Sequence, residues 1–322
     1  MYSLFIPWIA STVVIVSIIA VIRRKYWCFI LFVSISILLN ICFRCFAFGI
    51  LPHNDSENTL RVLTFNMNGE HDKCSAKDKL NFIIAQKADI VYLAEDFYVI
   101  CVEVDSALSR LYPYSTYDYN LSHYFYSKYP LTNSARIAEN VDEMATIVKT
   151  SVVIGRDSLV LVGCHLSSNN YTKDKVDVRS LSGLSRLISY FESINYSSNL
   201  RLHEAERIIS ELNDLPTIVL GDMNDVCGSP CMKVFAGTGL KDAWWEGGFG
   251  YGATIHKPLA YRIDHMLYQG GFRGFRGFKV SDASLVSGGS EGSNGLKLKG
   301  IKKVSSNGLS DHDALVAEFE LR

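Results

Sequence analysis

Residues 217–224 read Thr-Ile-Val-Leu-Gly-Asp-Met-Asn, an apolar run that ends in Asp222 and Asn224. The run TIVL has the length and the β-branched content of a buried strand, and the Gly-Asp-x-Asn element marks its exit. The two polar side chains therefore stand at a strand end. Taken alone, the element also fits an ordinary turn, because Asp and Asn tolerate turn backbone geometry.

Five further polar signatures extend this pattern along the chain. They are Asn66 in TFNMNG, Glu95 in VYLAED, His165 in LVGCHL, Asp264 in RIDHML, and Asp311 with His312 in LSDHDA. The apolar runs VLTF, DIVYLA, LVLVGC and YRI precede the first four signatures and indicate buried strands. We expect the strand ends to converge on one edge of a sheet and to gather these side chains.

The gathered set has a definite chemical character. It holds four acids, two amides and two imidazoles, and it offers no nucleophilic Ser or Cys. Oxygen-rich groups suit a hard divalent cation, and imidazoles suit a phosphate. The set therefore favours phosphoester chemistry over acyl transfer.

In order and spacing, these motifs resemble the endonuclease/exonuclease/phosphatase superfamily over residues 60–322, here as a membrane-anchored, bacterial-type member. The resemblance implies a four-layer α/β/β/α sandwich that hydrolyses phosphoesters. It also implies that Asn66 and Glu95 hold a divalent metal, usually Mg²⁺, with Mn²⁺ or Ca²⁺ as alternatives. Asp311 would either join the metal site or orient an imidazole.

The same resemblance assigns the catalytic roles. Asp222 would position or activate the attacking water, and Asn224 would contact the phosphate. Asp264 would orient His312 of the SDH element. His165 matches the histidine that deoxyribonuclease-like and sphingomyelinase-like members use.

Three positions depart from the family pattern or stay open. Asn68 stands where apurinic endonucleases have an acid, and Ala94 stands where a Gln often precedes the metal-binding Glu. Neither change removes a charge that single-metal chemistry needs. Tyr126, in a Tyr-Ser-Lys-Tyr-Pro element, is either a substrate-binding phosphate contact or a core aromatic residue.

The first fifty residues differ from the rest. They contain no Asp or Glu, and two apolar stretches, Leu4 to Ile22 and Tyr26 to Phe43, flank Arg23-Arg24-Lys25. Each stretch is about long enough for a ~30 Å hydrocarbon layer, which predicts two transmembrane helices. A cleaved signal peptide is the alternative, but its basic residues would precede the apolar run. By the positive-inside rule, the basic loop lies in the cytoplasm. The catalytic domain then lies outside, in the periplasm or at the cell surface.

These features predict an anchor at residues 1–50, a linker at 51–59 and a catalytic domain at 60–322. Without the four basic residues of the anchor, 28 Lys and Arg face 33 Asp and Glu, a formal charge of −5. An acidic domain disfavours long nucleic acid as a partner. A late cluster, Lys297, Lys299, Lys302 and Lys303, forms a basic patch that faces either acidic lipid or water, and the anchor on the same chain favours lipid.

Among the eight cysteines, Cys227 and Cys231 lie four residues apart, just after the GDMN element. In an oxidising compartment they either form a disulfide or remain free thiols.

Three functions fit the sequence. The first is a membrane-tethered, metal-dependent hydrolase of phosphodiesters or phosphomonoesters, including lipid or small-molecule substrates. The second is an extracytoplasmic nuclease, and the third is a catalytically silent binding module. Metal-dependent turnover separates the first two from the third.

Overall fold

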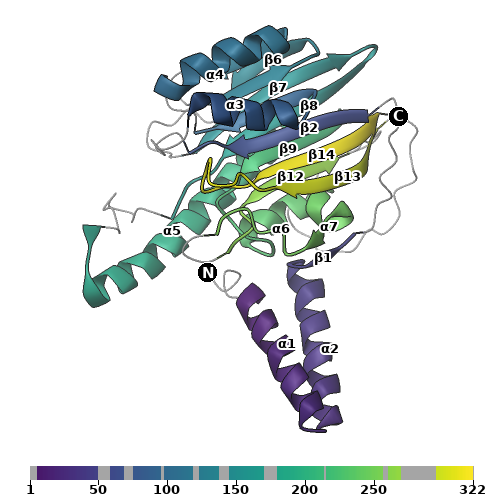
Figure 1. Ribbon diagram of the computed structural model, residues 1–322, viewed down its shortest axis with the longest axis vertical. Coiled ribbons are helices and arrows are strands. Elements are labelled where there is room, and N and C mark those ends of the chain that lie inside the picture. Colours follow the sequence, from purple (N-terminus) through teal and green to yellow (C-terminus); the bar gives the residue numbers. More distant parts are fainter. Residues whose placement is uncertain are drawn as a thin grey trace.

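The computed structural model describes residues 6–49, 59–68, 75–95, 98–118, 123–137, 145–169, 180–213, 215–256, 260–269 and 295–321. Within these residues, two six-stranded sheets pack against each other and helices cover their outer faces (Figure 1). The Arg-Phe repeat at 271–278 and nearly all of the Gly/Ser-rich stretch after it lie outside the described residues.

The first sheet has the strand order β13-β14-β2-β3-β5-β4, and only its central pair, β2 and β3, is parallel. Its strands are β2 (Thr59–Asn66), β3 (Ile90–Ala94), β4 (Tyr114–Asp118), β5 (His123–Ser127), β13 (Leu296–Val304) and β14 (Ala314–Leu321).

The second sheet has the order β10-β12-β9-β8-β7-β6, and only β8 and β9 are parallel. Its strands are β6 (Leu131–Arg136), β7 (Thr146–Ile154), β8 (Asp157–His165), β9 (Thr217–Asp222), β10 (Lys241–Asp242) and β12 (Asp264–Gln269).

The helices form the two outer layers. Those on the first sheet are α3 (Ala76–Ala85) and α4 (Tyr98–Leu111), and those on the second sheet are α5 (Gly183–Ser210) and α6 (Pro230–Gly237). A short helix, α7 (Ala243–Gly247), contacts β12 and β13 at the lower end of the sandwich.

Three buried clusters hold these layers together. Val62 and Leu161 belong to the cluster between the two sheets, while Leu63 belongs to the cluster beneath α3 and α4. Neighbouring residues of β2 thus face different cores, because successive side chains point to opposite faces of a strand. Both faces are buried, which explains why apolar residues occupy consecutive positions in the run VLTF, with Thr64 as its one polar residue. The predicted four-layer α/β/β/α sandwich is confirmed.

Two helix predictions meet different outcomes. The amphipathic pattern of Lys77 to Gln86 predicts a helix, which is confirmed as α3; it begins after Ser75, whose hydroxyl accepts a hydrogen bond from the Asp78 amide. The sequence also predicts separate helices at 178–191 and 200–212, and their separation is wrong, since one 28-residue helix, α5, covers most of both stretches. Its polar middle stays helical because Ser193 and Ser197 donate hydrogen bonds to the carbonyls of Asn169 and Ser168.

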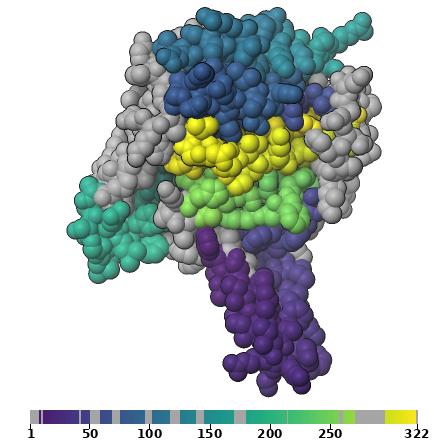
Figure 2. Space-filling model, in the orientation of Figure 1, coloured from purple at the N-terminus to yellow at the C-terminus, as the bar shows by residue number. Residues whose placement is uncertain are grey.

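At the N-terminus, α1 (Ile6–Ile22) and α2 (Tyr26–Phe43) form an antiparallel hairpin that projects from the sandwich (Figures 1 and 2). Arg23-Arg24-Lys25 lies at its far tip. Two short strands, β1 (Ala47–Phe48) and β11 (Phe249–Gly250), join its base to the domain. Within the described part of the chain, no helix combines the length and the apolar character needed to cross a membrane.

Candidate active site

The predicted convergence of polar side chains takes place at one edge of the two packed sheets. In the first sheet, Asn66 at the end of β2 lies opposite Ala94, the residue before Glu95. In the second sheet, His165 at the end of β8 lies opposite Asp222 at the end of β9. Because each pair of strands is parallel, all four polar residues leave the sandwich on the same side.

The last two signatures reach this edge in the opposite direction. Asp264 begins β12 and lies opposite Asp222, while Asp311 and His312 precede β14. The expectation that YRI forms a strand ending at Asp264 is wrong, since the strand starts there and runs to Gln269. An antiparallel strand brings its first residue, rather than its last, to the edge where its parallel neighbours end.

Asp222 stands at the centre of the cluster and is almost fully buried. Its Oδ2 atom accepts a hydrogen bond of 3.1 Å from Asn66 Nδ2, and its Oδ1 atom accepts one of 2.8 Å from the backbone N–H of Asn224. The Nε2 atoms of His165 and His312 each lie 3.8 Å from Oδ2. Asp222 therefore joins both sheets and faces both imidazoles.

The glycine before Asp222 is required by the tight packing behind it. Gly221 has φ = +134°, and a Cβ built there would lie 2.0 Å from the Cys164 carbonyl oxygen. No larger residue fits this position, because both the backbone conformation and the neighbouring strand oppose a side chain. This requirement explains the Gly in the Gly-Asp-x-Asn element.

His312 pairs with Asp264, as the resemblance implied. The Nδ1 atom of His312 lies 2.8 Å from Asp264 Oδ2, and both residues are buried. Burial alone would lower the pKa of His312, but the charges of Asp264 and Asp222 raise it to about 10. The imidazole is therefore protonated at neutral pH and directs Nε2 toward Asp222.

Glu95 and His165 form a second acid–imidazole pair. Glu95 Oε1 lies 3.0 Å from His165 Nε2, and both side chains remain partly exposed. Burial would raise the pKa of Glu95, but the hydrogen bond and charge of His165 lower it to about 2. Burial lowers the pKa of His165, but the hydrogen bond with Glu95 raises it, and the net shift is upward. Glu95 is therefore a carboxylate at neutral pH.

The pKa of Asp222 shifts in the opposite direction to that of Glu95. Burial and the neighbouring charge of Asp264 raise the pKa of Asp222 to about 6, although both imidazoles act to lower it. A carboxylate with a raised pKa is a stronger base than an exposed one, and its pKa is closer to neutral pH, where general bases work best.

Asn224 adopts a left-handed backbone conformation, with φ = +49°, at the turn after β9. Its Nδ2 atom donates a hydrogen bond of 2.8 Å to the Leu166 carbonyl. The amide group has a second N–H, which leaves one donor for a ligand.

Two supporting residues were absent from the sequence prediction. Ser310 Oγ donates to the Asn66 carbonyl at 2.8 Å and accepts from the His312 amide at 3.0 Å. Thr254 Oγ1 accepts from the Asp264 amide at 3.1 Å. These hydroxyl groups fix the backbones of Asn66, His312 and Asp264. The S of the SDH element was the available signal for Ser310.

A buried network behind Asn224 was also missed. Arg201 in α5 pairs with Asp225 at 3.2 Å and donates to the Ser167 carbonyl at 2.7 Å. Glu204 accepts hydrogen bonds from the Ser167 amide and hydroxyl groups. Arg201 and Glu204 are each 2% exposed, so this network anchors the loops after β8 and β9 to α5.

The structure does not bring Tyr126 to the cluster. Its ring is fully buried beside Tyr112, and its hydroxyl donates to Asp105 in α4 at 2.8 Å. Of the two alternatives for Tyr126, the core aromatic residue is the one observed.

The positive charge of the Lys cluster on β13 is partly neutralised, because Lys299 pairs with Glu320 and Lys303 with Asp313.

Among the residues that the structure describes, two groups of ligand atoms are close enough to share a cation. They are Glu95, His165 and Asp222, and Asp222, Asp264 and His312, with all ligand atoms in a group within 4.8 Å of one another. Neither group includes Asp311, which lies 3.9 Å from His312 Nε2. The carboxylates of Glu95 and Asp222, with the amide oxygen of Asn66 nearby, are the hard oxygen donors that Mg²⁺, Mn²⁺ or Ca²⁺ prefers. The donor set fits a divalent cation.

Comparison with known proteins agrees with this arrangement. The sequence profile of the Endonuclease/Exonuclease/phosphatase family matches residues 63–312, which include every site residue described above. No curated protein matches the sequence.

Solved structures share the fold at low sequence identity. D. rerio TDP2 humanized by 14 mutations aligns over 81% of this chain and 99% of that chain, at 14% identity and a TM-score of 0.54. D. rerio TDP2 complexed with single strand DNA product aligns over 81% and 99%, at 15% identity and 0.52. The human Nocturnin catalytic domain with bound sulfate anion aligns over 84% and 97%, at 18% identity and 0.53. At these identities the likeness concerns the fold.

Proposed function

This chain belongs to the endonuclease/exonuclease/phosphatase family, and on that premise we propose that it is a membrane-tethered, Mg²⁺-dependent phosphoester hydrolase. The observation that carries the proposal is the position of Asp222. Its carboxylate meets Asn66 from one sheet and lies 3.8 Å from the Nε2 atoms of both imidazoles. A buried base beside two imidazoles suits attack of water on a phosphoester.

The metal site is assigned to Glu95 and Asn66, with Asp311 retained as an outer partner. When bound there, a divalent cation would polarise a phosphoryl oxygen and neutralise charge on the leaving group. Glu95 is suited to this site because its low pKa keeps it ionised. A bound cation would compete with His165 for Glu95, which leaves the imidazole available to substrate.

The proton chemistry is assigned to the chain's own groups. Asp222 accepts the proton of the attacking water, because its raised pKa makes it the stronger base. His312, kept protonated by Asp264, donates to a phosphoryl oxygen. His165 and the second N–H of Asn224 add two donors on the side of β8 and β9. Together these donors stabilise the additional negative charge of the transition state.

We further propose that the hairpin holds the domain at a lipid bilayer with its basic tip in the cytoplasm. Apolar side chains cover the hairpin on the outside, with Ile15 57%, Ile22 73% and Leu38 59% exposed. Phe48 and Phe249 at its base are 70% and 73% exposed and stack edge to face. Exposed apolar surface of this kind favours contact with lipid, with aromatic rings at the headgroup level. The two-span topology stays a prediction of the sequence.

The base of the hairpin also lies near the candidate site. Trp8 in α1 packs edge to face on Tyr261, with ring centroids 6.5 Å apart. Tyr261 forms a β-bridge with Ile255, and Ile255 forms another with His312. A substrate at the bilayer surface would therefore meet the catalytic edge directly. This position favours a lipid phosphoester or a small phosphoester over duplex DNA.

One comparison favours a second function, an extracytoplasmic nuclease. D. rerio TDP2, which shares the fold, was solved with a single strand DNA product. The acidic balance of residues 60–322 opposes binding of long nucleic acid, because a chain that contacts many phosphates needs a basic surface.

The experiment assays the full chain in detergent micelles against four substrates at physiological salt. They are a small phosphodiester, a small phosphomonoester, phospholipid in mixed micelles, and supercoiled plasmid. Each is tested with Mg²⁺, Mn²⁺, Ca²⁺ or a chelator, and Asp222→Asn serves as the inactive variant. Asp157→Asn is the matched control, since Asp157 is exposed and lies at the opposite end of β8 from His165.

We expect metal-dependent turnover of a lipid or small phosphoester that Asp222→Asn loses and Asp157→Asn keeps. Efficient plasmid nicking without phosphoester turnover would make the nuclease the leading function. If substrate binds but no metal supports turnover, the catalytically silent binding module would become the leading function.

A further inference from the structure

The end of the hairpin and the loop after the catalytic strand meet through two sulfur atoms. Cys45 follows α2, and Cys227 lies five residues after Asp222. Their Sγ atoms are 3.3 Å apart, in hydrogen-bond contact, although the residues are separated by 182 positions in sequence. Both thiols are free, and both residues are buried, at 1% and 3% exposure.

This contact replaces the pair that spacing suggested. Cys231, four residues after Cys227, lies in α6 and packs in the core beneath α5 and α6 with Phe235 and Ile208. Cys227 instead shares a small cluster with Cys45, Phe43 and Phe46. A helical residue that faces the core cannot turn toward the preceding loop without leaving its cluster, so the near neighbour in sequence is the wrong partner.

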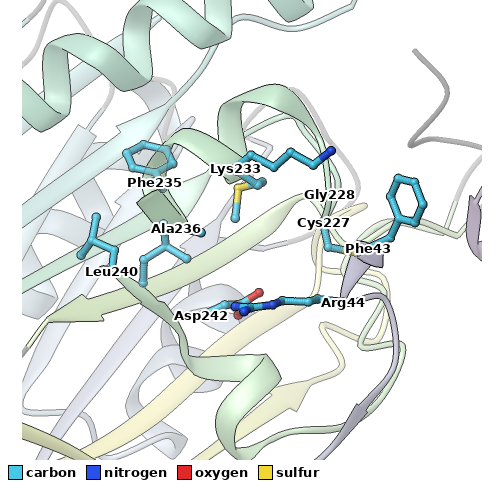
Figure 3. A pocket seen from close by; sticks show the side chains of 11 residues that line it. Phe43, Arg44, Cys227, Gly228, Lys233, Phe235, Ala236, Leu240 and Asp242 are labelled. Carbon is cyan, nitrogen blue, oxygen red and sulfur yellow. The ribbon is translucent and has the colours of Figure 1, made fainter. Parts of the chain in front are cut away.

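Cys227 is reached from a cavity at this junction. The cavity has a volume of about 280 Å³, and Phe43 and Arg44 of the hairpin form part of its wall together with Cys227 (Figure 3). Lys233 and Asp242 line it from the domain. The cavity therefore brings a small reagent next to Cys227, although this residue is buried.

The two sulfurs differ in acidity. The hydrogen bond with Cys45 lowers the pKa of Cys227, burial opposes this shift, and the buried charge of Arg262 adds to it. The same hydrogen bond, together with burial, raises the pKa of Cys45. Cys227, which lines the cavity while Cys45 does not, is therefore placed to attack an external disulfide first, in its thiolate form.

We propose that Cys45 and Cys227 form a disulfide that fastens the hairpin to the loop after the GDMN element. The inference rests on the proposed extracytoplasmic placement of the domain, where protein and small-molecule disulfides act as oxidants. The contact between the two sulfurs, with Cys227 among the residues that line a cavity, is its structural basis.

The reaction is a two-step exchange with an external disulfide. The Cys227 thiolate attacks one sulfur of the reagent, forms a mixed disulfide and releases the first reagent thiol. The Cys45 sulfur then attacks Cys227, releases the second reagent thiol and passes its proton to that leaving group. The pair is oxidised by two electrons, and the reagent disulfide is reduced to two thiols.

The first test uses the full chain in detergent, with a protease recognition sequence inserted between Asp55 and Ser56. The protein is treated with 2-hydroxyethyl disulfide, a small reagent that suits the cavity, then alkylated, cleaved and denatured. A disulfide would hold the hairpin fragment to the domain on a gel without reductant, and reductant would release it. This readout does not depend on catalysis, so it is independent of the proposed function.

Mass spectrometry identifies the bonded residues. Trypsin places Cys45 in the peptide of residues 45–61, and both Cys227 and Cys231 in the peptide of residues 208–233. The Cys231→Ser variant therefore assigns the bond to Cys227 and serves as the matched control. Oxidation should raise the midpoint of thermal unfolding of the wild type and of Cys231→Ser, because a crosslink across a long loop restricts the unfolded chain.

We expect Cys45→Ser and Cys227→Ser to lose both the linked fragment and this increase in thermal stability, while Cys231→Ser keeps both. Release of the hairpin from oxidised wild-type protein without reductant would overturn the proposal. So would a linked fragment that persists in Cys45→Ser, or a bond between Cys227 and Cys231.

Discussion

His312 and Asp264 form a buried ion pair, with 2.8 Å between Nδ1 and Oδ2, across the 48 positions that separate them in sequence. The pair leaves Nε2 of the imidazole directed at Asp222, 3.8 Å from its Oδ2 atom. The orientation and the protonation state of His312 are thus set by the same contact.

We therefore expect Asp264→Asn to lower the pKa of His312 from about 10 toward its ordinary value of about 6.5. In the wild type, the His312 imidazole loses its proton only as pH rises through its pKa in the folded protein. In the variant this loss would occur at a lower pH. Titration of the imidazole by NMR measures the shift, and turnover should fall by ~10² to 10⁴ at neutral pH. An unchanged His312 titration would show that Asp264 does not control its charge.

Glu95 is the carboxylate best placed for a cation. Glu95→Gln keeps the shape of the side chain and removes its charge. We expect it to abolish the rise in thermal stability that Mg²⁺ gives the wild type, since a ligand that binds only the folded state stabilises it. Turnover should fall by ~10² to 10⁴.

Asp157→Asn is the control for this prediction and should behave like the wild type. A Mg²⁺-dependent stabilisation that survives in Glu95→Gln would place the cation elsewhere, with Asp222 and Asp264 as the remaining acids of the two ligand groups.

Asp242 and Arg262 give a prediction about stability. Arg262 is fully buried, and its NH2 atom lies 2.7 Å from Asp242 Oδ2. Asp242→Asn would leave a buried charge without its partner, which costs about 3–5 kcal/mol of unfolding free energy. Asn can still cap α7, so the loss would come from the ion pair.

The same pair predicts the response to acid. Burial would raise the pKa of Asp242, but Arg262 lowers it below its ordinary value. A lowered folded pKa contributes stability that is present above about pH 4 and is lost as pH falls through the folded pKa. Chemical denaturation of the full chain between neutral pH and pH 3 should show a smaller acid-induced loss in Asp242→Asn than in the wild type. Equal losses in both would remove this pair from the acid response.

The basic tip of the hairpin gives a topological prediction. A reporter that matures only outside the cytoplasm should be active when it is fused after Arg322. The same reporter should be inactive when it is inserted at Arg24. A cytoplasmic signal at the C-terminus would reverse the proposed orientation.

The strand exits could be predicted from sequence because each rests on local chemistry. A strand buried on both faces is a short apolar run, and a polar turn must follow it, as at Asn66 and Asp222. The direction of β12 could not be predicted in this way. The run YRI is as apolar as the strand after it, and only pairing with β9 shows that Asp264 is its first residue.

Long-range partners were the other limit. Arg201 reads as a surface residue of an amphipathic helix, and its burial depends on Asp225, 24 positions away. Cys45 seemed to belong to the anchor alone, and its contact with Cys227 follows from how the hairpin base docks on the domain. Sequence spacing carries no signal for such pairs, because folding brings together residues that no local pattern connects.

The contact between Trp8 and Tyr261 has a kinetic consequence. It places the mouth of the catalytic edge beside the base of the hairpin, so that an enzyme held in a bilayer would encounter lipid substrate by diffusion in two dimensions. Its rate would then follow the mole fraction of substrate in the membrane rather than the amount of substrate per volume of solution. Adding inert lipid at constant total substrate would slow the reaction, and adding buffer would leave the rate per enzyme unchanged.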